Sequence, residues 1–369
     1  MPELNRPVCV VAGGSAGIGR AVAERFASEG YAIAVLAREP KRVGDAAHEI
    51  GEAYATETLG IPCDVIDQAQ VEAAAGRIDN TFGRIDVWVN AAMLTVIAPF
   101  EEMGGDEFEQ VVKGTFLGTV NGTRAALSRM KEQGRGNIVN VGSALAYRAI
   151  PLQTAYCSAK HATNGFTQAL RSELIHDGFD DIHLSLVQLP GVNTPQFDWA
   201  RNKIDAHPRP APPVYQPEVA ADGVWEAVRR NAREIFVGRV TPQFIFGNML
   251  APAALDRQLA SQGYSGQKAD DLANRGHPDG NLFEAVEGDY AAHGSFDDEA
   301  EASGMVVDGD NARMAFFGGL GLAALAVGMG LGAWMAGGRF RSDERRRHAL
   351  QRDYAEIGYE DGNDVKGLD

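Results

Sequence analysis

Cysteine is scarce in this chain. Only three occur among 369 residues, Cys9, Cys63 and Cys157, each in or beside an apolar run. An odd number without paired spacing predicts free thiols in a reducing compartment, and it argues against a disulfide framework and against a metal site. Cys157 follows Tyr156, so it is either a reactive thiol or a small filler residue, and we favour the filler.

Basic residues are also few: 34 lysines and arginines face 50 aspartates and glutamates, which gives a formal net charge of −16. That balance argues against a nucleic-acid partner, because binding phosphates requires a basic face. Residues 1–7 are polar and short, and without an apolar core they do not predict a secretory signal. The length allows two domains or a single α/β unit of about 250 residues with extensions.

A glycine-rich turn follows the first apolar run, Val8 to Ala12. Helical spacing begins directly after it, from Arg20 to Ser28, so the pattern is strand, turn and helix. Such a turn brings backbone N–H groups and a helix dipole close to a pyrophosphate, although a glycine turn without a ligand is the alternative. The candidate phosphate-binding residues are Gly13, Ser15, Gly17, Ile18 and Gly19.

The second expected strand, Tyr31 to Ala37, ends at Arg38. In dinucleotide folds an acidic residue at this point binds the ribose hydroxyls, whereas a basic one accommodates a 2′-phosphate. Arg38 therefore favours NADP(H) and leaves NAD(H) possible, and the alternative is a solvated surface arginine. Asp64 and Val65 follow the third strand, where an adenine edge is expected.

Strands and helices then alternate, which predicts a parallel sheet with right-handed crossovers. We expect an α/β fold of the Rossmann type, a doubly wound parallel sheet of about seven strands. The further strands are expected at Ile61–Cys63, Ile85–Val89, Asn137–Val141, Ile182–Leu189 and Glu234–Val237, and the further helices at Pro40–Tyr54, Gln68–Phe82, Asp106–Met130, Thr154–Leu174 and Gln216–Arg230.

Three candidate catalytic residues lie close together after the fifth strand: Ser143, Tyr156 and Lys160. Tyr156 and Lys160 are four residues apart, so they share one face of a helix. An ammonium beside the phenol predicts a lowered tyrosine pKa, which suits proton transfer at a substrate oxygen. A nearby serine hydroxyl can hold that oxygen as charge develops. By itself, Tyr-x-x-x-Lys also occurs by chance.

Together with the glycine turn and the Asn90-Ala91-Ala92 turn, these residues make the chain resemble the short-chain dehydrogenase/reductase family over residues 7–246. The resemblance implies a nicotinamide dinucleotide and hydride transfer between a carbonyl and an alcohol. It makes Tyr156 the acid/base and Lys160 the residue that lowers its pKa and binds the nicotinamide ribose. It also makes Ser143 the residue that positions the carbonyl.

The resemblance implies further contacts and three departures. Asn90, Val192 and Thr194 would contact the cofactor, the last two at the nicotinamide amide, and helix pairing would give a homodimer or homotetramer. The departures are Ala92 in place of a glycine, Thr115 in place of the asparagine that holds a proton-relay water, and a displaced Pro190–Gly191 pair. Thr115 is therefore a candidate catalytic residue whose hydroxyl would replace the asparagine.

A proline-rich stretch with three aromatic residues, Pro195 to Pro217, occupies the place of the family's substrate-covering loop. Long loops without secondary structure are often lids, and the aromatics indicate an apolar substrate. A stiff surface segment that packs its own aromatics is an equal alternative.

The chain beyond residue 250 has a different composition. We expect a catalytic domain at 1–250, an acidic and partly irregular extension at 251–312, an apolar helix at 313–337 and a charged tail at 338–369. Met314 to Ala336 carries no charged residue and would span about 35 Å, enough to cross a bilayer. A buried interface helix is the alternative.

The expected localisation is membrane-associated with a cytoplasmic catalytic domain, although the arginines after the helix leave its orientation open. The expected function is an NADP(H)-dependent oxidoreductase acting on a small apolar carbonyl or alcohol. The alternative is a catalytically weak NADP(H)-binding sensor or scaffold, motivated by Thr115 and the altered Asn90 turn.

Overall fold

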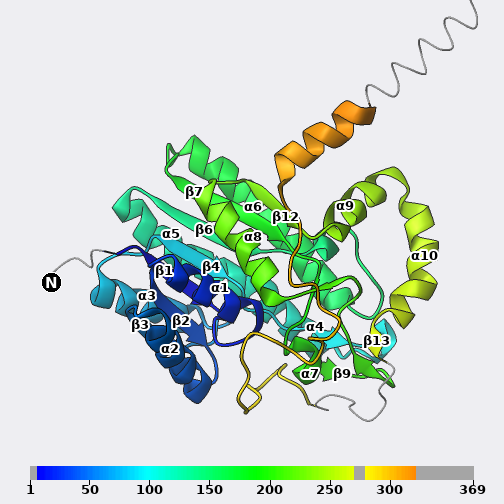
Figure 1. Cartoon of the computed structure of the whole chain (residues 1–369), viewed down its shortest axis with the longest axis horizontal. Helices are drawn as coiled ribbons and strands as arrows, with labels where there is room; N and C mark the ends of the chain where they lie inside the picture. The colour runs from blue at the N-terminus through cyan, green and yellow to red at the C-terminus, as the bar shows by residue number, and fades with distance from the viewer. Residues whose placement is uncertain (1–5, 270–278, 321–369) are drawn as a thin grey trace, which may run out of the picture. The chain divides into compact units, whose positions relative to one another are not determined.

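A computed structural model describes residues 6–269 and 279–320 (Figure 1). Residues Met1–Asp310 form one compact unit, and Asn311–Asp369 form another. The acidic stretch up to Asp310 lies in the first of these units.

The first unit is built on an eight-stranded sheet of order β14-β12-β7-β6-β4-β1-β2-β3. Seven strands are parallel, as the sequence predicted, and their apolar runs are buried on both faces. The eighth, β14, comes from the acidic extension and pairs antiparallel with β12 at the sheet edge. The bounds are β1 Val8–Ala12, β2 Ala32–Ala37, β3 Thr58–Pro62, β4 Val87–Asn90, β6 Gly136–Val141, β7 Ile182–Gln188, β12 Glu234–Val237 and β14 Val306–Asp308.

Helices cover both faces of this sheet (Figure 1). Helices α1, α2 and α8 pack on one face, where Phe26 contacts Tyr31 and Trp225 edge to face. Helices α3, α5 and α6 pack on the other. Their bounds are α1 Gly17–Ser28, α2 Pro40–Tyr54, α3 Gln68–Phe82, α5 Gly118–Gln133, α6 Thr154–His176 and α8 Pro217–Arg229. The fold class is confirmed: a doubly wound α/β sheet.

The helix expected at Asp106–Met130 is interrupted. It consists of α4 Gly105–Val112, a π-helical turn at Lys113–Leu117, and α5. Single π-turns inside helices frequently occur at functional sites. Here the turn carries Thr115 into the protein interior.

Short elements replace the structureless loop expected at Pro195–Pro217. They include helix α7 Gln196–Trp199 and the two-residue strands β9 Arg201–Asn202, β10 His207–Pro208 and β11 Val214–Tyr215. Their partners are β5 Val96–Ile97, β13 Lys268–Ala269 and β8 Gly191–Val192. Two more helices follow β12, α9 Val240–Leu250 and α10 Pro252–Ser265.

Residues 279–305 have almost no regular secondary structure but pack against the sheet domain. Leu282, Ala292 and Phe296 are buried in it. These buried apolar side chains attach the segment to the sheet domain.

In the parts of the chain that the structure describes, no helix has the length and apolar character needed to cross a membrane. Residues 309–320 are helical. Most of the apolar helix expected at Met314–Ala336 and all of the charged tail lie outside the described residues. The expected membrane helix therefore gains no support here.

Candidate active site

The carboxyl ends of β1, β2, β4, β6 and β7 face one cavity of about 300 Å³. Ligands of open parallel sheets bind at this edge, because the strand order reverses there and leaves a crevice. Thirteen of the fifteen residues expected at the site line the cavity: Gly13, Ser15, Gly17, Ile18, Gly19, Arg38, Asp64, Val65, Ser143, Tyr156, Lys160, Val192 and Thr194. Asn90 and Thr115 do not.

The glycine turn between β1 and α1 is tight. Gly13 has a φ of +84°, and a Cβ there would lie 2.6 Å from the Ala92 nitrogen. A Cβ on Gly19 would collide with the Gly13 carbonyl. The turn after β4 forms with Ala92 in place of the glycine, since Ala92 does not adopt a positive φ.

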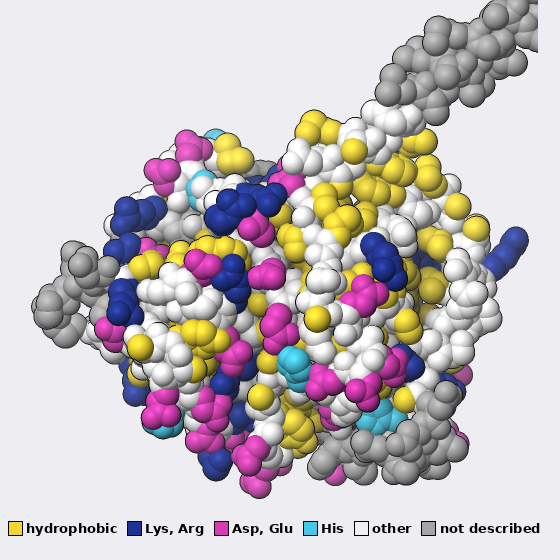
Figure 2. Space-filling view, viewed as in Figure 1, with side chains coloured by type: hydrophobic (Ala, Val, Ile, Leu, Met, Phe, Trp, Pro, Cys, Tyr) yellow, Lys and Arg dark blue, Asp and Glu magenta, His cyan; other side chains and the backbone are white. Residues whose placement is uncertain are grey.

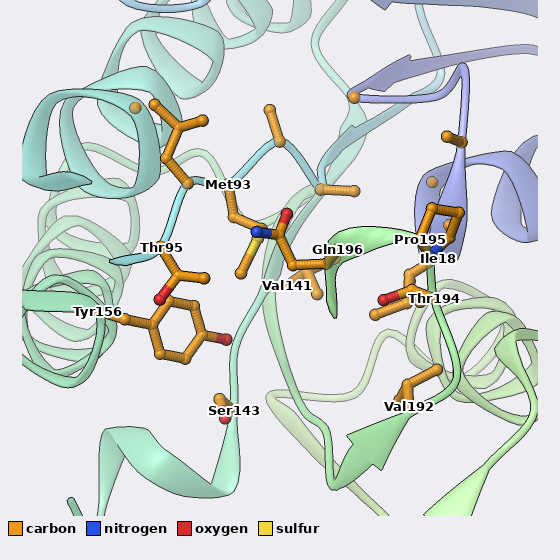
Figure 3. A pocket seen from close by; sticks show the side chains of 18 of the residues that line it. Ile18, Met93, Thr95, Val141, Ser143, Tyr156, Val192, Thr194, Pro195 and Gln196 are labelled. Atoms are coloured by element: carbon orange, nitrogen blue, oxygen red, sulfur yellow. The ribbon is translucent and has the colours of Figure 1, made fainter. Parts of the chain in front are cut away.

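Tyr156 and Ser143 meet inside the cavity (Figure 3). Tyr156 projects from the first turn of α6, and Ser143 lies where the chain leaves β6. The Ser143 hydroxyl hydrogen-bonds the phenol and also accepts a 3.1 Å bond from the Leu145 amide. The two hydroxyls therefore lie close together in the cavity.

The expected fall of the tyrosine pKa is wrong. Burial raises the pKa of Tyr156 well above its ordinary value, and the hydrogen bond from Ser143 offsets only part of that rise. Burial also lowers the pKa of Lys160 to about 8. The Lys160 ammonium lies 5.7 Å from the Tyr156 ring centre and donates a 2.6 Å bond to the Val141 carbonyl. Desolvation thus outweighs the attraction of the neighbouring cation.

Gln188, at the end of β7, holds the backbone of Ser143, and sequence reasoning missed it. Its Oε1 accepts a 2.9 Å bond from the Ser143 amide, and its Nε2 donates to Asn164 at 3.0 Å and to Glu234 at 2.8 Å. Tyr147 also donates to Glu234. All polar atoms of the Gln188 amide are therefore engaged, which fixes the strand end that carries Ser143.

Asn90 and Thr115 have structural partners. The Asn90 side chain accepts from Trp88 and donates to Asn140 and Thr123, in a buried network between β4, β6 and α5. The Thr115 hydroxyl accepts from the Leu94 amide at 2.9 Å and donates to the Leu94 carbonyl at 2.8 Å. Thr115 therefore fastens the loop after β4 to the π-turn, and its hydroxyl is already used.

Arg38 and Arg42 also line the cavity: Arg38 directly follows β2, and Arg42 lies in the first turn of α2. The Arg38 guanidinium donates to the carbonyls of Asn281 and Phe283. Arg42 was missed, although it lies only four residues after Arg38. The residues Asn281, Ala285 and Val286 also line the cavity, and nothing in their sequence signalled this.

Cys157 is buried, and burial raises the pKa of its thiol to about 11. A thiol that stays protonated at neutral pH is a poor nucleophile. The interpretation of Cys157 as a small filler residue agrees with this environment.

Comparison with known proteins identifies the class that this fold and site define. Residues 7–204 match the family model described as short chain dehydrogenase, which covers more than half of the chain. The chain therefore belongs to the short-chain dehydrogenase family and is an oxidoreductase that acts on CH–OH groups. Members of this fold bind a nicotinamide dinucleotide.

Among curated relatives, an uncharacterised oxidoreductase of Bacillus subtilis, YxnA, is 28% identical over 278 residues, which cover 74% of this chain and 77% of YxnA. A 3alpha-hydroxysteroid dehydrogenase of Mediterraneibacter gnavus is 32% identical over 51% of this chain and 74% of its own. The human dehydrogenase/reductase SDR family member 7 is 34% identical over 47% of this chain and 52% of its own.

Two solved structures share the fold. An alcohol dehydrogenase from the archaeon Thermococcus sibiricus, complexed with 5-hydroxy-NADP, has a TM-score of 0.52 and 26% identity, covering 63% of this chain and 96% of its own. A 3-ketoacyl-ACP reductase from Sinorhizobium meliloti has a TM-score of 0.54 and 25% identity, covering 61% and 93%. Both structures therefore cover less than two thirds of this chain.

The Gln188 network generates one prediction. Gln188→Met should lower kcat by about tenfold or more, because the Ser143 amide loses its partner and the hydroxyl moves from its reacting position. Dinucleotide affinity should remain within about twofold. Tyr147→Phe is the matched control, since it removes a bond to Glu234 and leaves Ser143 held. Equal loss of kcat in both variants would contradict a role through Ser143.

The buried Lys160 generates a second prediction, on stability. Between pH 8 and the unfolded-state pKa near 10.4, the unfolded chain binds more protons at this residue than the folded protein does. The free energy of unfolding of the wild type should therefore rise with pH in this window relative to Lys160→Met, by roughly 3 kcal/mol in total. Urea denaturation of both proteins across the window measures it. If the free energies of unfolding of the two proteins changed equally with pH, the Lys160 pKa would not be lowered.

Proposed function

We propose that this protein is an NADP(H)-dependent oxidoreductase that interconverts a carbonyl and an alcohol, with Tyr156 as the acid/base. The observation that carries the proposal is the meeting of Ser143, Tyr156 and Lys160 in the cavity that the glycine turn also lines. The intact set of three argues against a catalytically weak sensor or scaffold.

Each of the three residues has a separate task. When bound, the nicotinamide supplies or accepts the hydride. The Ser143 hydroxyl holds the substrate oxygen while charge develops on it. Tyr156 donates its proton to that oxygen during reduction and takes it back during oxidation. Its raised pKa favours the protonated phenol, which suits Tyr156 to act as the acid.

Lys160 supplies the positive charge. With a pKa of about 8 it is largely protonated at neutral pH. We propose that its ammonium exchanges the Val141 carbonyl for the cofactor's ribose and stabilises the phenolate that forms at Tyr156.

The cofactor preference rests on Arg38 and on the neighbouring Arg42. Two guanidinium groups at the end of β2 provide donors for a 2′-phosphate, and phosphate–arginine bonds are among the strongest hydrogen bonds in proteins. NAD(H) lacks that phosphate and remains the less favoured cofactor.

The substrate is proposed to be small and apolar, or lipid-like. Apolar side chains, including Met93, Leu94, Phe197 and Phe244, line the cavity that contains Tyr156. Helix α7, which carries Phe197 and Trp199, lies in the stretch that resembles the family's substrate-covering loop.

Two proposals on assembly and location rest on the sequence. A homodimer or homotetramer would form through α5 and α6, as the family resemblance implies. A membrane anchor at Met314–Ala336 would concentrate the enzyme near lipid-like substrates, and detergent-free solubility of the full chain would argue against it.

Tyr156→Phe tests the chemistry. The variant should lose about 100-fold or more of kcat, because the phenol proton has no substitute, while it still binds NADPH. The assay is NADPH oxidation over a panel of apolar ketones and aldehydes. Tyr264→Phe, the same change at an exposed position on α10, should be as active as the wild type. Unchanged turnover in Tyr156→Phe would eliminate the proposed mechanism.

Arg38→Asp tests the cofactor. Replacing the guanidinium with a carboxylate should weaken NADPH binding about tenfold or more, since a charge-assisted hydrogen bond contributes about 1.5–3 kcal/mol. NADH binding should hold or improve. Titration of the cofactor's nicotinamide fluorescence gives both affinities, and an unchanged ratio between them would refute the assignment of Arg38.

A further inference from the structure

Residues 279–301, here called the strap, run along the cavity, and Asn281, Ala285 and Val286 line it. At one end of the strap, the Asn281 amide donates to the Trp199 carbonyl on α7. At the other end, the Glu301 amide donates to the Val214 carbonyl on β11. Between these ends it passes the β2 end, the glycine turn and Thr194 (Figure 1). It therefore runs past both arginines and the glycine turn, where the proposed cofactor's phosphates would bind.

A carbonyl of the strap accepts a hydrogen bond from a backbone amide of the glycine turn that could otherwise bind a phosphate. The Gly17 amide donates a 2.9 Å bond to the Ala291 carbonyl. Gly17 begins α1, whose N-cap residue, Ala16, provides no side-chain cap. First-turn amides of a helix lack partners within it and attract anions. Ala291 thus holds a position that a pyrophosphate oxygen would need.

The strap also engages both arginines at the β2 end. Arg38 donates to the carbonyls of Asn281 and Phe283, and Arg42 donates to those of Val286 and Gly288. These four acceptors are neutral backbone oxygens. A phosphate would bind the same guanidinium groups more strongly, because a charged acceptor forms hydrogen bonds about twice as strong as a neutral one.

A cation–π and aromatic contact also holds the strap against α2 and α7. The Arg42 guanidinium lies 5.1 Å from the Trp199 ring centre and 5.3 Å from that of Tyr290. The two rings meet edge to face at 4.6 Å. Tyr290 therefore joins the strap to α2 and to α7 at once.

The strap is strongly acidic, as expected of a segment that takes the place of a phosphate anion. It contains eight acidic residues and neither lysine nor arginine. In Figure 2 acidic side chains gather on the face that the strap crosses. A closed strap repels the phosphates of an entering dinucleotide while it satisfies the donors that would bind them.

We propose that the strap is an internal competitor for the dinucleotide, and that residues 281–291 belong to the cofactor-binding site. Its carbonyls hold the Gly17 amide, Arg38 and Arg42 until the cofactor's phosphates replace them. The inference rests on the proposed cofactor chemistry of this cavity. Cofactor affinity then depends on the fraction of molecules whose strap is open.

Tyr290→Ala in the full-length protein tests the competition. Removal of the ring weakens the closed strap, so NADPH should bind about five- to twentyfold more tightly, with faster association. Nicotinamide fluorescence and stopped-flow mixing measure the two quantities. Tyr290→Phe, which keeps the ring, should behave as the wild type. Tyr264→Ala is the matched control at an exposed tyrosine outside the strap.

Hydrogen exchange of the wild type gives a second measurement that does not depend on a variant's folding. NADPH should increase backbone exchange in residues 281–291, because the strap carbonyls are displaced. Unchanged or slower exchange there, or unchanged NADPH kinetics in Tyr290→Ala, would overturn the strap proposal. Failure of the wild type to bind either NADPH or NADH would instead overturn the proposed function.

Discussion

The site depends on one constraint: parallel strands that end at the same edge of a sheet. The glycine turn follows β1, Arg38 follows β2, Ser143 follows β6, and the Pro190–Gly191 turn follows β7. The strand order reverses between β1 and β4, so these ends border one crevice. Residues more than a hundred positions apart in the chain thereby form one cavity.

Burial at this edge sets the starting state of the chemistry. The cavity desolvates both Tyr156 and Lys160, which raises the pKa of the phenol and lowers that of the ammonium. Both shifts favour neutral groups over charged ones. Burial therefore holds Tyr156 in its acid form.

The strap controls access of the dinucleotide to this edge of the sheet in our proposal. A helix N-terminus and two arginines form an anion site, and a protein that leaves such donors buried needs acceptors for them. The strap, which lies beyond the residues that the family model matches, provides neutral carbonyls for these donors and an acidic surface around them. The acidic strap and the basic site formed by Arg38 and Arg42 are therefore complementary in charge.

The sequence alone determined the sheet, the glycine turn and the Ser143, Tyr156 and Lys160 set, because each is encoded by local spacing. Hydrophobic period and turn residues act over a few neighbours, so they can be read without the fold. Only the tertiary structure decided the roles of Gln188, Thr115 and Arg42, and the addition of β14 and the strap. Those depend on contacts between distant segments and on the balance of desolvation against charge, neither of which a local pattern contains.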